Sequence, residues 1–316
     1  MNKLIFLLFL PCMVFAQDTF KMEKKADNPN KGTTLDINEF IKGTLLMPDA
    51  SDPAPLVILL TGSGPNDRNG NSMMTRNDSH KQLAIALRDN GIASYRYDKR
   101  SFTLVKERKP TDDITFDSFV LDAKTVISHF ANDKRFSSIT LAGHSQGSLV
   151  AMLAMNENID GFISIAGPAD SIDQSIVEQV AAQAPGLDKE LEQVFSKMRS
   201  QDSLVSGINP YIAHLVGPQV QPFMKSWMVY NPKELIKDID VPVLILNGTR
   251  DRQVNESQAQ KLHDALSDSK LVIIEGMNHV FKKVGDDDVE AAKSYQDPSF
   301  PLHPKLVSSI VEFVKK

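Results

Sequence analysis

Residues 137–151 constrain the fold of this 316-residue chain more than any other stretch. A short strand-forming run (ITL) leads into the sequence GHSQG, and a helix-forming segment follows it. Gly143 and Gly147 flank Ser145 at both second-neighbour positions. A tight strand-to-helix turn leaves no room for side chains at those two positions, and it lifts the serine hydroxyl clear of the sheet edge. The motif therefore predicts a nucleophilic serine on such a turn if the rest of the chain supplies the sheet.

A repeating strand–helix pattern supplies that sheet. Two strands joined by a turn are expected at residues 33–37 and 40–47. Five further runs have strand character: residues 56–60, 92–97, 162–166, 241–246 and 271–274. Helical patterns separate these runs, and Thr111 or Asp112 is expected to cap the helix that precedes the serine motif. The alternation predicts an α/β protein with a mostly parallel central sheet flanked by helices.

The alternation breaks between residues 168 and 240, where no strand-like run occurs. Two helical patterns and a segment rich in Pro, Met and aromatic residues fill this interval. A helical insertion into a strand–helix series is typical of a cap or lid. We therefore expect a core formed by residues 17–167 and 241–316 and a cap formed by residues 168–240. Four cap residues either line an apolar acyl pocket or pack the cap onto the core: Met224, Trp227, Met228 and Tyr230.

The first residues have the pattern of a secretory signal. Lys3 supplies a positive charge, an apolar segment follows, and small residues precede a cleavage position after Ala16. The apolar segment is short for a membrane span and contains Pro11. We expect residues 1–16 to be a signal peptide and the mature protein to be periplasmic or extracellular, without stable membrane insertion. Cys12 is the only cysteine in the sequence, so a chain cleaved after Ala16 has no disulfide and no cysteine nucleophile. Whether Cys12 is lipidated stays open.

The net charge and the spacing of the acidic residues argue against a nucleic-acid partner and against a calcium site. The net charge is −5 and the Lys and Arg residues are scattered, so no nucleic-acid partner is expected. The run Asp286-Asp287-Asp288 lacks the spacing of a calcium loop and is interpreted as solvated surface. We expect no metal and no organic cofactor. The sequence does not indicate an oligomeric state.

A serine nucleophile needs a base, and the base works best when a carboxylate fixes its tautomer. Asp251 follows the strand expected at 241–246, and His279 follows the strand expected at 271–274. Because the carboxyl ends of parallel strands share one sheet edge, Ser145, Asp251 and His279 are expected at the same edge. The order Ser, Asp, His, each just past a strand, predicts a catalytic triad.

Other acids and histidines compete for these roles. Asp98 follows the strand expected at 92–97 and is interpreted as an ion-pair or turn residue. His144 is expected to pack structurally inside the turn, whereas His80 and His214 remain candidates for a substrate pocket. The order along the chain favours Asp251 and His279 over all of these.

Ester or amide hydrolysis also needs hydrogen-bond donors for the oxyanion that develops. The backbone N–H of Gln146, directly after Ser145, is the first candidate. The second is expected on the loop after residues 56–60, with Ser63 as the best candidate and Gly62 as the next. Alternatively, the sequence TGSGP at this position is only a turn.

Several stretches together resemble the secreted bacterial α/β-hydrolases of the serine esterase and prolyl-aminopeptidase-like group. They are TGSGPNDRNG (61–70), YRYDKR (95–100), GHSQGS (143–148), VPVLILNGTRDRQV (241–254) and GMNHVF (276–281). The resemblance implies an α/β-hydrolase fold with Ser145, Asp251 and His279 as the triad and Ser63 and Gln146 as oxyanion donors. The chain has Gln146-Gly147-Ser148 where Glu-Gly-Gly is common, and Ser101 where glycine is common. Because both differences can alter the pocket, substrate preference is not carried over.

These observations predict a serine hydrolase that cleaves a carboxylic ester of a small acyl substrate through an acyl-enzyme. An aminopeptidase or thioesterase on the same fold is the first alternative, and cap acids such as Glu178 or Glu190 would favour the aminopeptidase by holding a peptide amine. A binding protein without turnover on a hydrolase scaffold is the second.

Overall fold

The structure is a computed structural model that describes residues 32–316. The expected signal peptide, which includes Cys12, lies outside these residues, so the signal peptide and its cleavage stay predictions. Within the described range, no helix is both long enough and apolar enough to cross a membrane.

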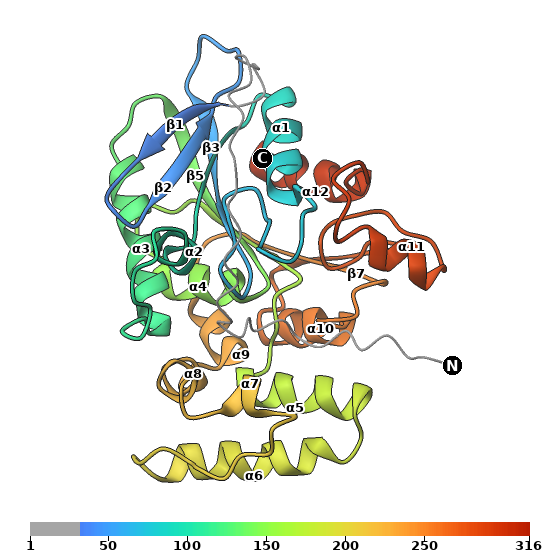
Figure 1. Ribbon diagram of the computed structural model, residues 1–316. Helices are drawn as coiled ribbons and strands as arrows, with labels where there is room; N and C mark the ends of the chain where they lie inside the picture. The colour runs from blue at the N-terminus through green and yellow to red at the C-terminus, as the bar shows by residue number, and fades with distance from the viewer. Residues whose placement is uncertain (1–31) are drawn as a thin grey trace.

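Within residues 32–316, eight strands form one sheet in the order β1-β2-β4-β3-β5-β6-β7-β8. Figure 1 shows this sheet with helices on both sides. Their bounds are β1 (Thr33–Asp36), β2 (Lys42–Leu46), β3 (Ala54–Leu60), β4 (Ala93–Tyr97), β5 (Phe136–His144), β6 (Gly161–Ile165), β7 (Val243–Gly248) and β8 (Lys270–Ile274). β2 pairs antiparallel with β1 and β4, and every other neighbouring pair is parallel. The predicted mostly parallel sheet is confirmed.

Helices follow β3 and every later strand along the chain. They are α1 (Ser79–Asp89), α2 (Arg100–Lys106), α3 (Phe116–Phe130), α4 (Gln146–Ala154), α5 (Ile172–Gln183), α6 (Leu187–Ser200), α7 (Ala213–Val216), α8 (Gln221–Met228), α9 (Pro232–Leu235), the short 3-10 helix η2 (Ile236–Asp238), α10 (Glu256–Ala265), α11 (Asp288–Lys293) and α12 (Pro304–Val314). The sequence did not predict α2, α7, α8, α9 or α11 as separate helices. The predicted cap of α3 is also wrong, because α3 begins after Thr115, whose N–H donates to the Ser118 hydroxyl at 3.2 Å.

The two faces of the sheet pack against different helices, as the alternation along β3 shows. Leu56, Ile58 and Leu60 face an apolar cluster that includes residues of α3, α4 and α10. Val57 and Leu59 face the opposite cluster, which includes residues of α1 and α12. Helices on both faces leave the carboxyl edge of the parallel strands as the place where loops can gather.

Helices α5 to α9 form the connection between β6 and β7, and α5, α6 and α8 lie below the sheet in Figure 1. Three of the four candidate pocket residues of this segment are buried: Met224, Trp227 and Met228. The Trp227 ring stacks on Phe116 of α3, with centroids 5.3 Å apart. Tyr230 donates a hydrogen bond from its hydroxyl to Asp117, also on α3. These contacts favour packing of the segment onto α3 over an open acyl pocket.

Candidate active site

Ser145 lies between β5 and α4 with φ 53° and ψ −121°, a conformation that non-glycine residues rarely adopt. A Cβ at Gly143 would lie 2.3 Å from the Gly147 carbonyl oxygen, and a Cβ at Gly147 would lie 2.5 Å from the Leu60 carbonyl oxygen. Both positions therefore require glycine. The Ser145 N–H donates to the Ile165 carbonyl of β6 at 2.9 Å, which ties the turn to the sheet. The local sequence thus dictates a strained turn that presents Ser145.

This strain gives a stability prediction. Because glycine tolerates positive φ, we expect Ser145→Gly to exceed Ser145→Ala in free energy of unfolding by about 1 kcal/mol, after the greater chain entropy of glycine is subtracted. Urea denaturation of the two variants measures the difference. Equal stabilities, or a more stable alanine variant, would contradict strain at this position.

Asp251 and His279 lie together past the ends of β7 and β8. His279 Nδ1 is 2.7 Å from Asp251 Oδ2, and only 4% and 8% of these two residues are exposed. Asp251 Oδ1 accepts the N–H groups of Gln253 (2.8 Å) and Val254 (2.9 Å). The carboxylate is therefore held on both oxygens, and it fixes the proton of His279 on Nδ1.

The structure brings His279 and Asp251 into contact but places no hydrogen bond between His279 and the Ser145 hydroxyl. Within residues 32–316, His279 Nε2 makes no hydrogen bond. The turn that carries Ser145 contacts the loop that carries His279 through His144, whose side-chain Nε2 lies 2.9 Å from the main-chain carbonyl oxygen of His279. Hydrogen bonds between nucleophile and base are often long in unliganded enzymes and tighten when substrate binds.

The histidines next to this pair are buried and neutral. The His144 ring lies 4.6 Å from the His279 ring, and burial holds the pKa of His144 well below its ordinary value. His144 therefore donates from Nε2 to the His279 carbonyl, which agrees with the predicted structural role. His80 packs behind it, 5.5 Å from His144 and 5.4 Å from Phe281, and burial lowers the pKa of His80 to about 4. His214 lies on α7, away from these contacts.

Two N–H groups near Ser145 have no partner within residues 32–316. Gln146 is the first residue of α4, so its N–H has no acceptor inside the helix. The Ser63 N–H likewise donates to no residue of this range. The loop that carries Ser63 runs directly against the turn, because a Cβ at Gly62 would lie 3.2 Å from the Ser145 Cβ. Free N–H groups at a helix N-terminus suit a developing negative charge.

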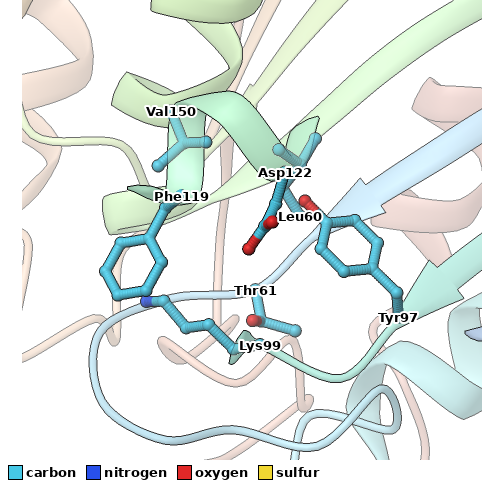
Figure 2. A pocket seen from close by; sticks show the side chains of 7 residues that line it. All are labelled: Leu60, Thr61, Tyr97, Lys99, Phe119, Asp122 and Val150. Atoms are coloured by element: carbon cyan, nitrogen blue, oxygen red, sulfur yellow. The ribbon is translucent and has the colours of Figure 1, made fainter. Parts of the chain in front are cut away.

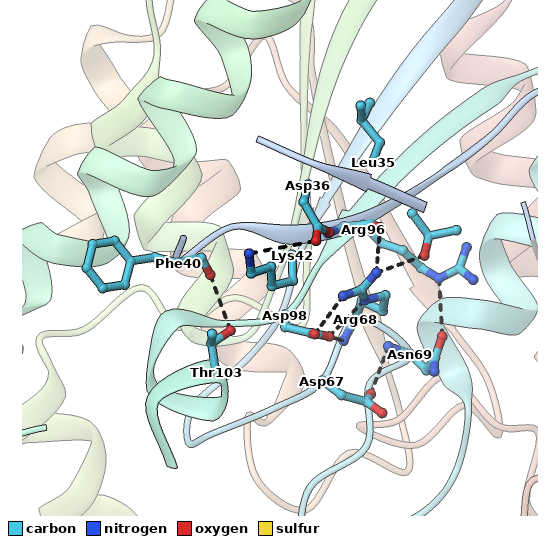
Figure 3. A network of polar contacts seen from close by, with 12 residues as sticks. Leu35, Asp36, Phe40, Lys42, Asp67, Arg68, Asn69, Arg96, Asp98 and Thr103 are labelled. Carbon is cyan, nitrogen blue, oxygen red and sulfur yellow. Dashed lines mark hydrogen bonds and ion pairs between the residues drawn. The ribbon is translucent and has the colours of Figure 1, made fainter. Parts of the chain in front are cut away.

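Asp98 takes part in a different contact, shown in Figure 3. Arg68 Nε donates to Asp98 Oδ1 at 2.9 Å, and Arg68 Nη2 donates to Oδ2 at 2.7 Å. Arg68 Nη1 also donates to the Gly43 carbonyl and to the Thr44 hydroxyl of β2. The ion pair fixes the loop after β3 to the edge of the sheet, so the interpretation of Asp98 as an ion-pair residue agrees with the structure.

The acidic run in the loop after β8 is exposed, which agrees with its interpretation as solvated surface, and its carboxylates contact neighbouring residues. Asp286 pairs with Arg250 and Asp288 pairs with Arg252. Asp287 caps α11 by accepting the Val289 N–H at 2.8 Å. Within the described part of the chain, no group of three or more His, Cys, Asp or Glu residues is placed to hold a metal ion.

Sequence reasoning missed one residue of this site. Lys99 donates from Nζ to the Gly62 carbonyl at 2.7 Å and to the Gln146 side-chain carbonyl. It therefore contacts both segments that carry the free N–H groups. The signals available in the sequence were its position two residues past the end of β4, at the same sheet edge as the other site residues, and its place in the stretch YRYDKR (95–100).

An eight-stranded, mostly parallel sheet with a strained serine turn and a histidine–aspartate pair at its carboxyl edge defines the α/β-hydrolase class. The model of the alpha/beta hydrolase family matches residues 57–281. The chain therefore belongs to this family.

Known proteins of the same fold include esterases. Esterase EstD of Thermotoga maritima is 27% identical over 248 residues, which cover 76% of this chain and 58% of EstD. Est1E from Butyrivibrio proteoclasticus superposes with a TM-score of 0.53 at 17% identity, covering 87% of this chain and 95% of Est1E. A bromoperoxidase from Bacillus anthracis superposes with a TM-score of 0.52 at 16% identity, covering 90% and 99%. The two structures share the fold, and a shared fold alone does not define an activity.

Proposed function

We propose that this protein is a serine hydrolase that cleaves carboxylic esters through an acyl-enzyme. Ser145 is the nucleophile, His279 the general base and Asp251 the carboxylate that orients it. The observation that carries the proposal is the His279–Asp251 hydrogen bond of 2.7 Å at the sheet edge that presents Ser145. A histidine held in this tautomer has Nε2 available to accept the serine proton.

The reaction follows from this arrangement. His279 Nε2 takes the Ser145 hydroxyl proton while Oγ attacks the ester carbonyl carbon, and Asp251 stabilises the imidazolium that forms. The N–H groups of Ser63 and Gln146 donate to the carbonyl oxygen as it becomes negative. The tetrahedral intermediate expels the alkoxide, which receives the proton from His279. Water, deprotonated by His279, then attacks the acyl-enzyme. The second tetrahedral intermediate releases the acid while His279 returns the proton to Ser145 Oγ, which restores both residues to their starting state.

Relatives support esters of small acyl groups as the substrate class. EstD is named an esterase, and ferulic acid, an aromatic carboxylic acid, is bound in a structure of Est1E. The acids named for the aminopeptidase alternative contact neighbouring side chains. Glu178 accepts hydrogen bonds from Asn255 and Gln258, and Glu190 accepts one from Asn209. These bonds leave acceptor sites free on both carboxylates, so the substrate series decides between an ester and a peptide.

A substrate series tests the class of bond that is cleaved. Purified protein is assayed with p-nitrophenyl esters of increasing acyl length, with matched p-nitroanilides and with matched thioesters. We expect kcat/KM for the best ester to exceed that for its matched anilide by at least about 100-fold. Faster release of nitroaniline would instead indicate an aminopeptidase, and a thioester preferred over the matched ester would indicate a thioesterase.

A further inference from the structure

Lys99 is a buried cation next to the site, with 6% of its surface exposed. Within residues 32–316 it forms no ion pair with a carboxylate. Its ammonium donates to the Gly62 carbonyl and to the Gln146 side chain, and it lies 4.3 Å from the centroid of the Phe119 ring. Figure 2 shows the side chain extending toward that ring. Burial of an unpaired charge is costly, and such groups gather at functional sites.

The two groups that accept hydrogen bonds from the Lys99 ammonium lie next to the two free N–H groups, those of Ser63 and Gln146. The Gly62 carbonyl and the Ser63 N–H are parts of one planar peptide, so a bond that holds the oxygen also fixes the direction of the N–H. Gln146 carries the second N–H on its own backbone. Asn66 reinforces the loop. Its side-chain Nδ2 donates to the main-chain carbonyls of Gly62 (3.1 Å) and Ser63 (2.7 Å). Its main-chain carbonyl accepts the main-chain N–H of Lys99 (3.1 Å).

We propose that Lys99 is the positioning residue of the oxyanion hole. Its ammonium holds the Gly62–Ser63 peptide and Gln146 in a fixed relation, and it places a positive charge behind both donors. An oxyanion is stabilised well only when donors are held in advance within about 2.7–3.1 Å of it. This inference rests on the proposed esterase function, because it assigns Lys99 to the reaction of that same site.

The surroundings of Lys99 offer no competing role. The cavity beside it has a volume of about 20 Å³, room for about one water molecule, and is too small for an acyl group. Asp122 lines the same cavity, but Arg100 binds its carboxylate, with Nε 2.8 Å from Oδ2. The charge of Lys99 therefore acts on the loop and the turn.

The charge of Lys99 also depends on pH. Burial lowers the pKa of Lys99 to about 7, so the ammonium is present below this pH and is lost above it. Lys99 has three titratable neighbours: Asp122 of α3, Tyr97 of β4 and His144 of β5. Asp122 is bound by Arg100. Burial raises the pKa of Tyr97 far above its ordinary value and lowers that of His144 far below, so neither titrates near pH 7.

Lys99→Met, which keeps an unbranched side chain one atom shorter and removes its charge, tests the inference. In an assay below pH 7, where the Lys99 ammonium is present, we expect kcat for a short p-nitrophenyl ester to fall by about 10- to 100-fold with KM changed less than about threefold, because a misdirected donor weakens only transition-state binding. Lys282→Met is the matched control. Lys282 is fully buried and its Nζ also donates to a glutamine side chain, Gln82, and to a main-chain carbonyl, Phe300. We expect Lys282→Met to lose about as much unfolding free energy as Lys99→Met and to keep the parent kcat.

Lys99→Arg supplies an independent readout, because arginine stays charged. We expect the parent to lose kcat between about pH 7 and pH 9 and Lys99→Arg to keep its own kcat over that range. A kcat for Lys99→Met within about threefold of the parent would overturn the inference. So would the same alkaline loss in the parent and in Lys99→Arg, even if Lys99→Met does not fold. Ser145→Ala, run in parallel, separates the two proposals: activity that survives it overturns both, whereas activity that it abolishes but Lys99→Met preserves overturns only the role of Lys99.

Discussion

Ser145→Ala lowers kcat for ester hydrolysis by about 10⁴- to 10⁶-fold, which is the largest effect that we expect of any single substitution. The alanine variant has no atom that can form the acyl-enzyme, so only transition-state binding by the Ser63 and Gln146 N–H groups remains. Steady-state assays of the parent and the variant with a short p-nitrophenyl ester measure the change.

A matched control keeps this result interpretable. Ser308 is exposed on α12, and we expect Ser308→Ala to hydrolyse the ester at the parent rate. Circular dichroism of both variants verifies that the fold is retained. A Ser145→Ala protein that keeps more than about 1% of the parent kcat would contradict nucleophilic catalysis by this residue.

Asp251→Asn gives the second-largest effect, a loss of about 10⁴-fold in kcat. Asp251 Oδ1 accepts the N–H groups of Gln253 and Val254, so the carbonyl oxygen of the new amide takes this place. Its NH₂ group then faces His279 Nδ1, which must accept a hydrogen bond and moves the imidazole proton to Nε2. In that tautomer Nε2 cannot take the Ser145 proton. The pH-independent kcat of the folded variant reports the loss.

Asp98→Asn is the control for this prediction, because Asp98 is the rival acid of the sequence. Removing its charge leaves Arg68 partly buried and unpaired, which costs about 3 kcal/mol of unfolding free energy. Since Asp98 contacts no triad residue, we expect less than about a tenfold change in kcat. Urea denaturation and ester assays measure the two effects. A loss of kcat as large as that of Asp251→Asn would contradict the assignment of Asp251.

The sequence was sufficient where local chemistry determines structure. Gly143 and Gly147 predicted the strained turn at Ser145, and the close approach of Gly147 to β3 explains why no other residue fits there. Asp251 and His279 were predicted to share the edge of Ser145 because each follows a parallel strand. Their hydrogen bond needed no further information once the sheet was correctly predicted.

The sequence was insufficient where distant residues decide the outcome. Lys99 is 37 residues from Gly62 and 47 from Gln146 along the chain, so nothing near Lys99 reveals that its ammonium is buried between them. Thr111, Asp112 and Thr115 are all suitable helix N-cap residues by type. The choice among them depends on where Phe116 packs against Trp227 of α8. Tertiary contacts, rather than local propensity, fix both features.

The most direct test of Ser145 as an activated nucleophile is covalent labelling with a fluorophosphonate, followed by mass spectrometry of the digested protein. We expect one phosphonyl adduct, on Ser145, in the parent protein and none in Ser145→Ala, because only an activated serine hydroxyl reacts rapidly with this probe. An unlabelled parent protein, or an adduct on a different residue, would contradict the proposed mechanism.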